Sequence, residues 1–205
     1  MNAGVVGIAG LPCAGKSAVC RLLAEDGWFV IDCDRLGHEA LDDPGVRAAL
    51  AHRFGSGIFG ADGRVLRPRL ADRVFGDREP GALAALEAMV HPWILARARD
   101  FTAKALAAGR PAAWEAALLF ASGADGDCGM AWVVESPEAD RAARARARGW
   151  APEELARRDM RLRPGLDRAL SEGRARRIRN DGTPGGLRRA LAEALGSSYV
   201  LRLPS

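Results

Sequence analysis

Residues 10–17 read Gly-Leu-Pro-Cys-Ala-Gly-Lys-Ser and match the phosphate-loop pattern G-x-x-x-x-G-K-[ST] in full. The loop follows the apolar run Val5–Ala9 and precedes the amphipathic stretch Lys16–Ala24, so it joins a predicted strand to a predicted helix. Backbone N–H groups in such a loop point toward a phosphate, and the positive end of the helix dipole adds to the attraction. We therefore expect the chain to bind a nucleoside triphosphate.

Individual positions of the loop have predicted tasks. Lys16 supplies a positive charge for the β- and γ-phosphates, and the hydroxyl of Ser17 is placed to ligate Mg²⁺. Pro12 lacks an N–H but precedes the donors nearest the phosphates, so we expect little loss. Cys13 is either a small residue that fits the turn, which is the simpler explanation, or a reactive thiol at a helix N-terminus. The residues expected to contact the nucleotide here are Gly10, Cys13, Ala14, Gly15, Lys16, Ser17 and Ala18.

Composition limits the class of protein. The chain has 205 residues, 48% of them hydrophobic, which suits one α/β domain with insertions. No stretch approaches the roughly 18 apolar residues of a membrane span, and no export signal precedes the first predicted strand. The four cysteines show no C-x-x-C spacing, which predicts reduced thiols and a cytoplasmic protein.

The formal net charge of +4 raises the question of a nucleic-acid partner. Only two of the 30 basic residues, Lys16 and Lys104, are lysines, and half of the 30 lie between residues 138 and 189. Guanidinium groups suit phosphate recognition, but a nucleic-acid groove also needs aromatic side chains, and this stretch contains only Trp150. We expect the arginines to serve an anionic nucleotide and expect no nucleic-acid partner.

Apolar runs and helical periodicity alternate along the chain. Five strands are predicted, at Val5–Ala9, Trp28–Ile31, Ala112–Trp114, Met130–Glu135 and around Ile178. Helices are predicted at Lys16–Asp26, Arg35–Leu41, Pro44–Phe54, Arg67–Phe75, Gly81–Ala108, Arg141–Arg148, Pro152–Arg161 and Leu187–Leu195. Pro92 is expected to end or kink its helix near His91. Strands separated by helices predict a five-stranded parallel sheet with helices on both faces.

Two carboxylates, Asp32 and Asp34, follow the second predicted strand. They are expected at the same edge of the sheet as the phosphate loop, because ligands of parallel sheets bind beyond the carboxyl ends of the strands. In phosphoryl transfer one carboxylate orients or deprotonates the attacking hydroxyl. Either aspartate could instead cap the following helix. We expect at least one of the two to be catalytic.

With these features the chain resembles the dephospho-coenzyme A kinase family, a nucleoside-monophosphate-kinase-like branch of the P-loop NTPase fold. The resemblance rests on the phosphate loop and on shorter motifs in the family's order, namely Val30-Ile31-Asp32-Cys33-Asp34, His38, Phe54-Gly55, Asp62-Gly63, Arg67 with Leu70 and Val74-Phe75, His91-Pro92, Leu118-Leu119-Phe120, Val133–Pro137, Arg144 with Arg148, and Asn180-Asp181-Gly182. It covers nearly the whole chain as a single domain. It implies a core at about 1–34, 110–136 and 175–205, a helical substrate-side insertion at about 35–109, and a lid at about 137–174.

The resemblance implies transfer of the γ-phosphate of ATP to the 3′-hydroxyl of dephospho-coenzyme A, with Mg²⁺ as the metal. By position, Asp34 corresponds to the general base. Arg144 and Arg148 would close over the phosphates from a mobile lid, and their i, i+4 spacing places both on one helical face. Asn180 would lie near the ATP base, or it forms a turn before Gly182. For the oligomeric state we expect a monomer or a weak homo-oligomer.

Substrate contacts are implied for four residues, Asp32, Arg67, His91 and Glu115. Arg67 could instead cap a helix, and His91 could mark a kinked core helix. Glu115 stands where the family has an aspartate, so it keeps the charge, reaches farther, and is open to a metal-linked or a substrate-binding role.

Other positions depart from the family pattern on the substrate side and in the lid, namely Ala117, Ala121, Arg161 and Ala175. They leave three alternatives beside the main hypothesis: a P-loop kinase for another small metabolite, a nucleotide-binding homologue with weakened catalysis, and, last, a basic nucleic-acid-binding protein.

Overall fold

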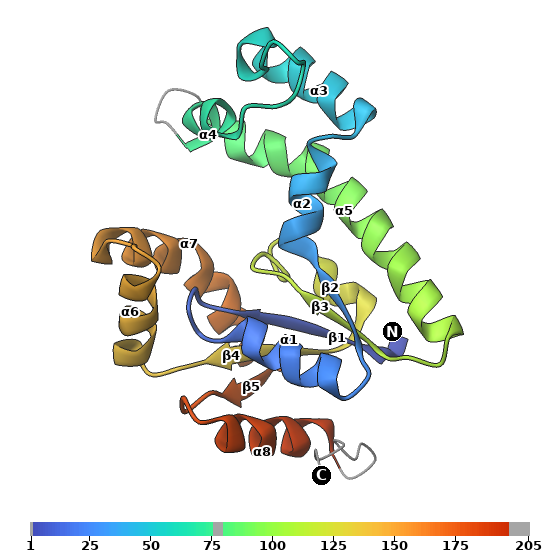
Figure 1. Cartoon of the computed structure of the whole chain (residues 1–205), viewed down its shortest axis with the longest axis vertical. Coiled ribbons are helices and arrows are strands. Elements are labelled where there is room, and N and C mark those ends of the chain that lie inside the picture. Colours follow the sequence, from blue (N-terminus) through green and yellow to red (C-terminus); the bar gives the residue numbers. More distant parts are fainter. Residues whose placement is uncertain (1, 76–79, 197–205) are drawn as a thin grey trace. The chain divides into compact units, whose positions relative to one another are not determined.

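The computed structural model describes residues 2–75 and 80–196 (Figure 1). In chain order the elements are β1 (Asn2–Gly10), α1 (Lys16–Glu25), β2 (Phe29–Asp32), α2 (Cys33–Ala40), α3 (Pro44–Phe54), η1 (Ser56–Ile58), α4 (Arg67–Phe75), α5 (Ala82–Ala107), β3 (Ala112–Glu115), η2 (Ala124–Asp127), β4 (Cys128–Glu135), α6 (Glu138–Ala147), α7 (Pro152–Ser171), β5 (Arg176–Arg179) and α8 (Pro184–Leu195). Within the described ranges, no helix combines the length and the apolar character needed to cross a bilayer.

The five strands form one parallel sheet in the order β2-β3-β1-β4-β5, which confirms the predicted sheet. Glu115 at the end of β3 lies opposite Ile8 of β1 on one side and opposite Asp32 of β2 on the other. Across the sheet, Gly10 at the end of β1 lies opposite Val134 of β4. The carboxyl ends of three neighbouring strands therefore bring two acidic side chains to the edge where the phosphate loop begins.

Helices cover both faces of the sheet, as predicted. Ala113 of β3 belongs to a buried apolar cluster that includes Leu23 of α1 and Leu191 of α8. The next residue, Trp114, points to the opposite face because side chains alternate along a strand. There its Nε1 donates a hydrogen bond of 2.8 Å to Oγ1 of Thr102 in the last turns of α5. Apolar burial on two faces is what holds a parallel sheet in place.

The chain divides into two compact units. The first unit, residues 1–32 and 101–205, contains the sheet and the phosphate loop. The second unit, residues 33–100, contains α2, α3, α4 and most of α5, and it has an apolar core of its own in which Leu50 and Ile58 are fully buried. The chain passes from one unit to the other directly after β2 and again within α5.

Two helices continue through a proline. Helix α5 runs through Pro92 and α7 runs through Pro164. Helix α5 therefore does not end near His91, and the alternative of a kink at Pro92 stays a prediction. The expected end of the second lid helix at Arg161 is wrong. Both prolines are exposed, as are the residues four positions before them, so water can satisfy the carbonyl groups that lose a helical partner. In α7, burial of Leu166 in the turn beyond the proline favours continuation of the helix.

Several elements begin earlier than predicted. Helix α8 begins at Pro184 instead of Leu187, because the side chain of Thr183 caps it and accepts a hydrogen bond of 3.1 Å from the N–H of Gly186. A proline directly after the cap is favourable, since its missing N–H has no helical partner in any case. Helix α6 likewise begins at Glu138, which places an acidic residue in its first turn.

Candidate active site

The two glycines of the phosphate loop are required by conformation and by space. Gly10 and Gly15 have φ values of 152° and 101°, which side chains disfavour. A Cβ on Gly10 would lie 2.5 Å from the carbonyl oxygen of Val134. A Cβ on Gly15 would lie 2.1 Å from Nδ2 of Asn180. Glycine is therefore required at position 10 because β4 lies close to the backbone there, and at position 15 because the segment after β5 does.

Cys13 also has a positive φ, of 62°, and is the one non-glycine residue with this feature in the part of the chain that the structure describes. Its side chain is buried against Ala145 of α6 and Leu155 of α7. This packing supports the explanation that Cys13 is a small residue that fits the turn.

Side chains from outside the loop bind its carbonyl groups. Nη1 of Arg144 donates a hydrogen bond of 3.0 Å to the carbonyl oxygen of Cys13 and one of 2.9 Å to Oγ of Ser136. The carbonyl oxygen of Ala14 accepts hydrogen bonds from Nδ2 of Asn180 at 2.9 Å and from Oγ of Ser136 at 3.0 Å. Because the C=O and N–H of one peptide unit point in opposite directions, the contacts at the Ala14 carbonyl turn the N–H of Gly15 toward the interior of the loop. The N–H of Ala14 itself donates a hydrogen bond of 3.2 Å to the carbonyl oxygen of Leu11.

Asn180 therefore has a contact with the loop in addition to a turn role. Its Oδ1 accepts a hydrogen bond of 3.1 Å from the N–H of Gly182, which is the turn expected from the sequence. Its position near the base of ATP remains a prediction.

The two charged or polar side chains of the motif are both held in place. Nζ of Lys16 donates a hydrogen bond of 3.1 Å to the carbonyl oxygen of Gly10, at the mouth of the loop. Oγ of Ser17 donates a hydrogen bond of 3.0 Å to Oε1 of Glu115. The sequence left Glu115 between a metal-linked and a substrate role, and the structure places its carboxylate directly beside the residue predicted to ligate the metal.

Cys20 lies behind this pair, on α1. Burial raises the pKa of its thiol, and the charge of Glu115 together with a hydrogen bond to that carboxylate raises it further. The thiol therefore stays protonated at neutral pH and serves as a second, weak donor toward Glu115 beside the hydroxyl of Ser17.

A cleft of about 520 Å³ opens beside the loop, a size that suits a nucleotide. Its charged lining consists of Lys16, Arg21, Glu25, Arg144, Arg148 and Arg188. Five cationic groups and one carboxylate make the cleft complementary to a polyphosphate. Arg144 of α6 and Arg148, the residue directly after α6, both line the cleft.

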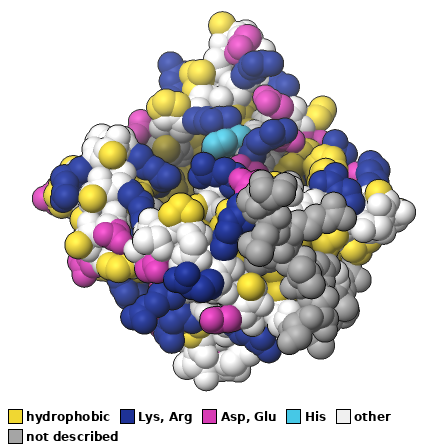
Figure 2. Space-filling model, turned by 60° about the horizontal axis from the view of Figure 1, so that its bottom comes forward, with side chains coloured by type: hydrophobic (Ala, Val, Ile, Leu, Met, Phe, Trp, Pro, Cys, Tyr) yellow, Lys and Arg dark blue, Asp and Glu magenta, His cyan; other side chains and the backbone are white. Residues whose placement is uncertain are grey.

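On the face shown in Figure 2, Lys and Arg side chains are interspersed with acidic and apolar ones and do not form one continuous stripe. Among the described residues, only four of the arginines line the cleft, so most of this basic composition lies outside it.

Three of the predicted site residues belong to the second unit. Asp34 lies in the first turn of α2, Arg67 is the exposed first residue of α4, and His91 is half-buried in the middle of α5. Lys16 belongs to the first unit, so the expectation that Lys16 and Asp34 face one cleft stays a prediction.

The sequence did not single out two side chains of this site, Ser136 and Arg141. Ser136 directly follows β4, at the edge of the sheet where the loop lies, and that position is the signal that could have found it. Nε of Arg141 donates a hydrogen bond of 2.9 Å to the carbonyl oxygen of Pro12. Arg141 precedes Arg144 by three residues, about one helical turn, and so shares its face of α6.

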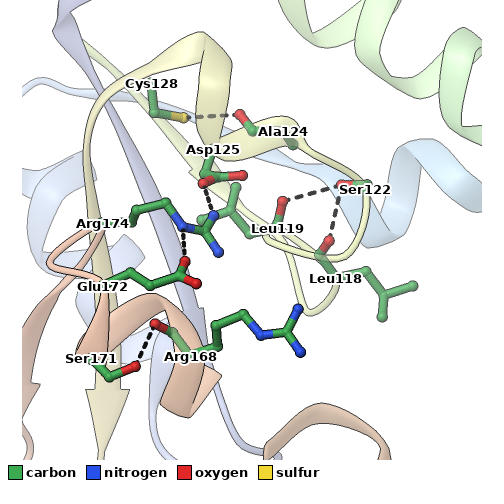
Figure 3. A network of polar contacts seen from close by, with 10 residues as sticks. All are labelled: Leu118, Leu119, Ser122, Ala124, Asp125, Cys128, Arg168, Ser171, Glu172 and Arg174. Atoms are coloured by element: carbon green, nitrogen blue, oxygen red, sulfur yellow. Dashed lines mark hydrogen bonds and ion pairs between the residues drawn. The ribbon is translucent and has the colours of Figure 1, made fainter. Parts of the chain in front are cut away.

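The segment after β3, which carries the Leu118-Leu119-Phe120 motif, is held by a polar network (Figure 3). Nη1 of Arg174 pairs with Asp125 at 2.5 Å, which joins the turn after α7 to this segment. Nε of the same arginine pairs with Glu172 at 2.9 Å. The guanidinium also lies 5.5 Å from the ring centre of Phe120. Within the segment, Oγ of Ser122 donates to the carbonyl oxygen of Leu118 at 2.9 Å.

A phosphate loop between β1 and α1, with a basic cleft at the carboxyl edge of a five-stranded parallel sheet, defines a P-loop nucleotide-binding protein. A family model described as dephospho-CoA kinase matches residues 4–169. The chain therefore belongs to the dephospho-CoA kinase family.

Individual relatives agree with this assignment. The chain is 34% identical over 197 residues to the dephospho-CoA kinase of Rhodopirellula baltica, covering 94% of this chain and 90% of the relative. It is 34% identical over 195 residues to that of Geobacter sulfurreducens, covering 92% and 95%.

Solved structures agree as well. The crystal structure of TT1252 from Thermus thermophilus is 31% identical with a TM-score of 0.74, covering 93% of this chain and 95% of that one. The dephospho-CoA kinase from Campylobacter jejuni shares the fold, with a TM-score of 0.66 at 20% identity over 94% of this chain and 95% of that one.

Proposed function

We propose that this chain transfers the γ-phosphate of ATP to the 3′-hydroxyl of the ribose of dephospho-CoA, which yields CoA and ADP and is the last step of CoA biosynthesis. Membership of the dephospho-CoA kinase family supports the reaction and the acceptor. The observation that carries the proposal is the phosphate loop, whose carbonyl groups are bound by Arg144 and Asn180 and which borders a cationic cleft.

In this proposal the donor side of the reaction belongs to the first unit. The inward N–H groups of the loop and the ammonium of Lys16 bind the β- and γ-phosphates and stabilise the charge that develops during transfer. Arg144 and Arg148 neutralise charge from the other wall of the cleft, and the α6–α7 hairpin acts as the lid that excludes water. Asn180 lies beside the base of ATP.

Mg²⁺ is the proposed metal. Within the described ranges, no group of three or more His, Cys, Asp or Glu side chains forms a ready-made metal cluster. Mg²⁺ instead prefers one or two protein oxygen ligands completed by water and phosphate oxygens, and the hydroxyl of Ser17 beside the carboxylate of Glu115 fits that demand. When bound there, the ion would neutralise negative charge on the phosphates during transfer.

The acceptor side is proposed to use Asp32, the last residue of β2, and three residues of the second unit. Asp34 is the proposed general base that takes the proton of the 3′-hydroxyl, while Asp32, Arg67 and His91 contact the acceptor. Arg67 offers an exposed guanidinium suited to a phosphate of the substrate.

For the remaining properties we propose a cytoplasmic protein that is a monomer or a weak homo-oligomer and has no nucleic-acid partner. The scarcity of aromatic residues in the arginine-rich stretch 138–189, which contains only Trp150, supports the last point.

The test is an assay of the purified protein with Mg·ATP and a panel of acceptors, in which ADP release is coupled to NADH oxidation and the product is identified by mass spectrometry. The proposal predicts CoA from dephospho-CoA, with little ADP release from nucleoside monophosphates or sugars. ADP release that depends on another acceptor would assign the chain to a different reaction of the same fold. Tight ATP binding without transfer to any acceptor would show that catalysis has been lost.

A further inference from the structure

We propose that Arg141 is a positioning residue for ATP: it fixes the phosphate loop through the carbonyl group of Pro12, and Asp159 of α7 holds its guanidinium in place. The inference rests on the proposed function, because it concerns how the same loop receives the triphosphate.

The first observation is the burial of Arg141. Its side chain is 4% exposed, which is unusual for a charged group, and the carboxylate of Asp159 pairs with its Nη2 while being 16% exposed itself. A buried guanidinium needs a countercharge and hydrogen bonds to offset the cost of leaving water. Here one nitrogen binds Asp159 and another, Nε, donates to the carbonyl oxygen of Pro12 at 2.9 Å. The carboxylate therefore orients the arginine, and the arginine orients the loop.

The second observation is the strain at the residue that this contact controls. Cys13, with its φ of 62°, occupies a conformation that a residue with a side chain keeps only when its surroundings impose it. The peptide unit before Cys13 carries the carbonyl of Pro12, which Arg141 binds. The peptide unit after it carries the carbonyl of Cys13 itself, which Arg144 binds. Two arginines one helical turn apart thus clamp both peptide planes around the strained residue.

The chemical consequence follows from the planarity of the peptide. Holding the Pro12 carbonyl away from the interior of the loop directs the N–H of Cys13 into it, where an oxygen of the bound phosphate would accept it. Arg144 lines the cleft and could also contact the nucleotide directly, whereas Arg141 lies behind the loop and acts only through it. Arg141 is therefore expected to affect the phosphates of ATP without touching the base or the acceptor.

The experiment compares R141Q, R141K and D159N with the matched control R158Q. Arg158 lies on α7 next to Asp159, but its guanidinium pairs with Glu154 at 2.7 Å on the exposed side of the hairpin. Binding of ATP, ADP and adenosine is measured by displacement of a fluorescent ATP analogue, without any acceptor. Circular dichroism and thermal unfolding establish that each variant is folded. Steady-state kinetics then give the KM for ATP and the KM for dephospho-CoA separately.

We expect R141Q to weaken ATP and ADP binding about tenfold and to raise the KM for ATP by a similar factor. Affinity for adenosine and the KM for dephospho-CoA should stay within about twofold of the wild type. D159N should act in the same direction but less, and R158Q should match the wild type. R141K keeps the charge for Asp159 but loses the planar fork that reaches both partners, so it should fall between the wild type and R141Q.

The inference is overturned if folded R141Q binds ATP as the wild type does, or if it weakens adenosine as much as ATP. Should R141Q not fold, R141K decides: wild-type ATP affinity in that variant overturns the inference in the same way. A wild-type protein that phosphorylates no dephospho-CoA would contradict the proposed function and leave the ATP-binding comparison intact, so the two failures are distinguishable.

Discussion

Replacement of Gly15 by alanine tests the close approach between the phosphate loop and the segment after β5. At φ 101° a Cβ costs about 1–2 kcal/mol of backbone strain. The new methyl group would lie 2.1 Å from Nδ2 of Asn180, so the amide must move and lose its hydrogen bond to Ala14. The displaced amide nitrogen of buried Asn180 then lacks its acceptor, which costs about 1–3 kcal/mol more, whereas the Ala14 carbonyl keeps its hydrogen bond from Ser136. The expected loss in the free energy of unfolding is therefore about 2–5 kcal/mol.

The control is Gly27→Ala. Gly27 has a φ of 89°, and a Cβ there meets no atom within 4 Å, so this variant carries the backbone strain without the clash. Urea unfolding followed by circular dichroism compares both variants with the wild type, and ATP titration reports on the loop itself. Combining Gly15→Ala with Asn180→Ala removes the clash, so the double variant should be more stable than the sum of the two single losses predicts.

Two results would refute this reasoning. One is a Gly15→Ala variant that is no less stable than Gly27→Ala and binds ATP normally, which would show that the two segments do not approach so closely. The other is strict additivity of the Gly15 and Asn180 substitutions, because independent effects mean that the side chain of Asn180 is not what the new methyl group meets.

Three further predictions concern other contacts. In the folded protein the thiols of Cys20 and Cys128 should resist iodoacetamide at about pH 8, because burial raises the pKa of both thiols, that of Cys128 to about 12, and leaves almost no thiolate. Mass spectrometry of the labelled protein before and after unfolding in urea checks this prediction. Rapid labelling of either cysteine in the native protein would contradict it. Glu115→Gln should raise the Mg²⁺ concentration that gives half-maximal activity by roughly several-fold, while ADP binding measured without metal is retained. An unchanged Mg²⁺ titration would show that Glu115 does not contribute to the metal site. Thr102→Val should lower the free energy of unfolding by about 1–3 kcal/mol, because Nε1 of buried Trp114 loses its acceptor; an unchanged urea midpoint would show that this bond does not matter.

Features that depend on neighbouring residues in the sequence were predictable. The phosphate loop, its flanking strand and helix, and the five strands follow from motif spacing and apolar runs, and the structure confirms them. The site of Glu115 was partly predictable, since a strand end is where ligands of a parallel sheet bind, but only the structure places it beside Ser17.

Features that depend on tertiary environment were not predictable. Whether a proline ends a helix depends on whether its freed carbonyl meets water, which is why α5 and α7 continue through Pro92 and Pro164. The contacts that Arg141 and Arg144 make with loop carbonyls span about 130 positions of the chain, and no local pattern distinguishes them from the many exposed arginines. Burial is what separates Arg141 from its neighbours, and burial is a property of the fold.

The proposed roles of Lys16 in ATP binding and of Asp34 as general base are tested most directly by comparing Lys16→Ala with Asp34→Asn. For each variant, ATP affinity is measured by calorimetry and turnover by CoA formation, with Asp72→Asn, an exposed position on α4, as the control. The account predicts that Lys16→Ala loses both ATP binding and turnover. It predicts that Asp34→Asn binds ATP normally but loses turnover by about 10²–10⁴-fold, the usual contribution of a positioned base. Wild-type turnover in Asp34→Asn would contradict the assignment of the base, and normal ATP affinity in Lys16→Ala would contradict the role of the loop.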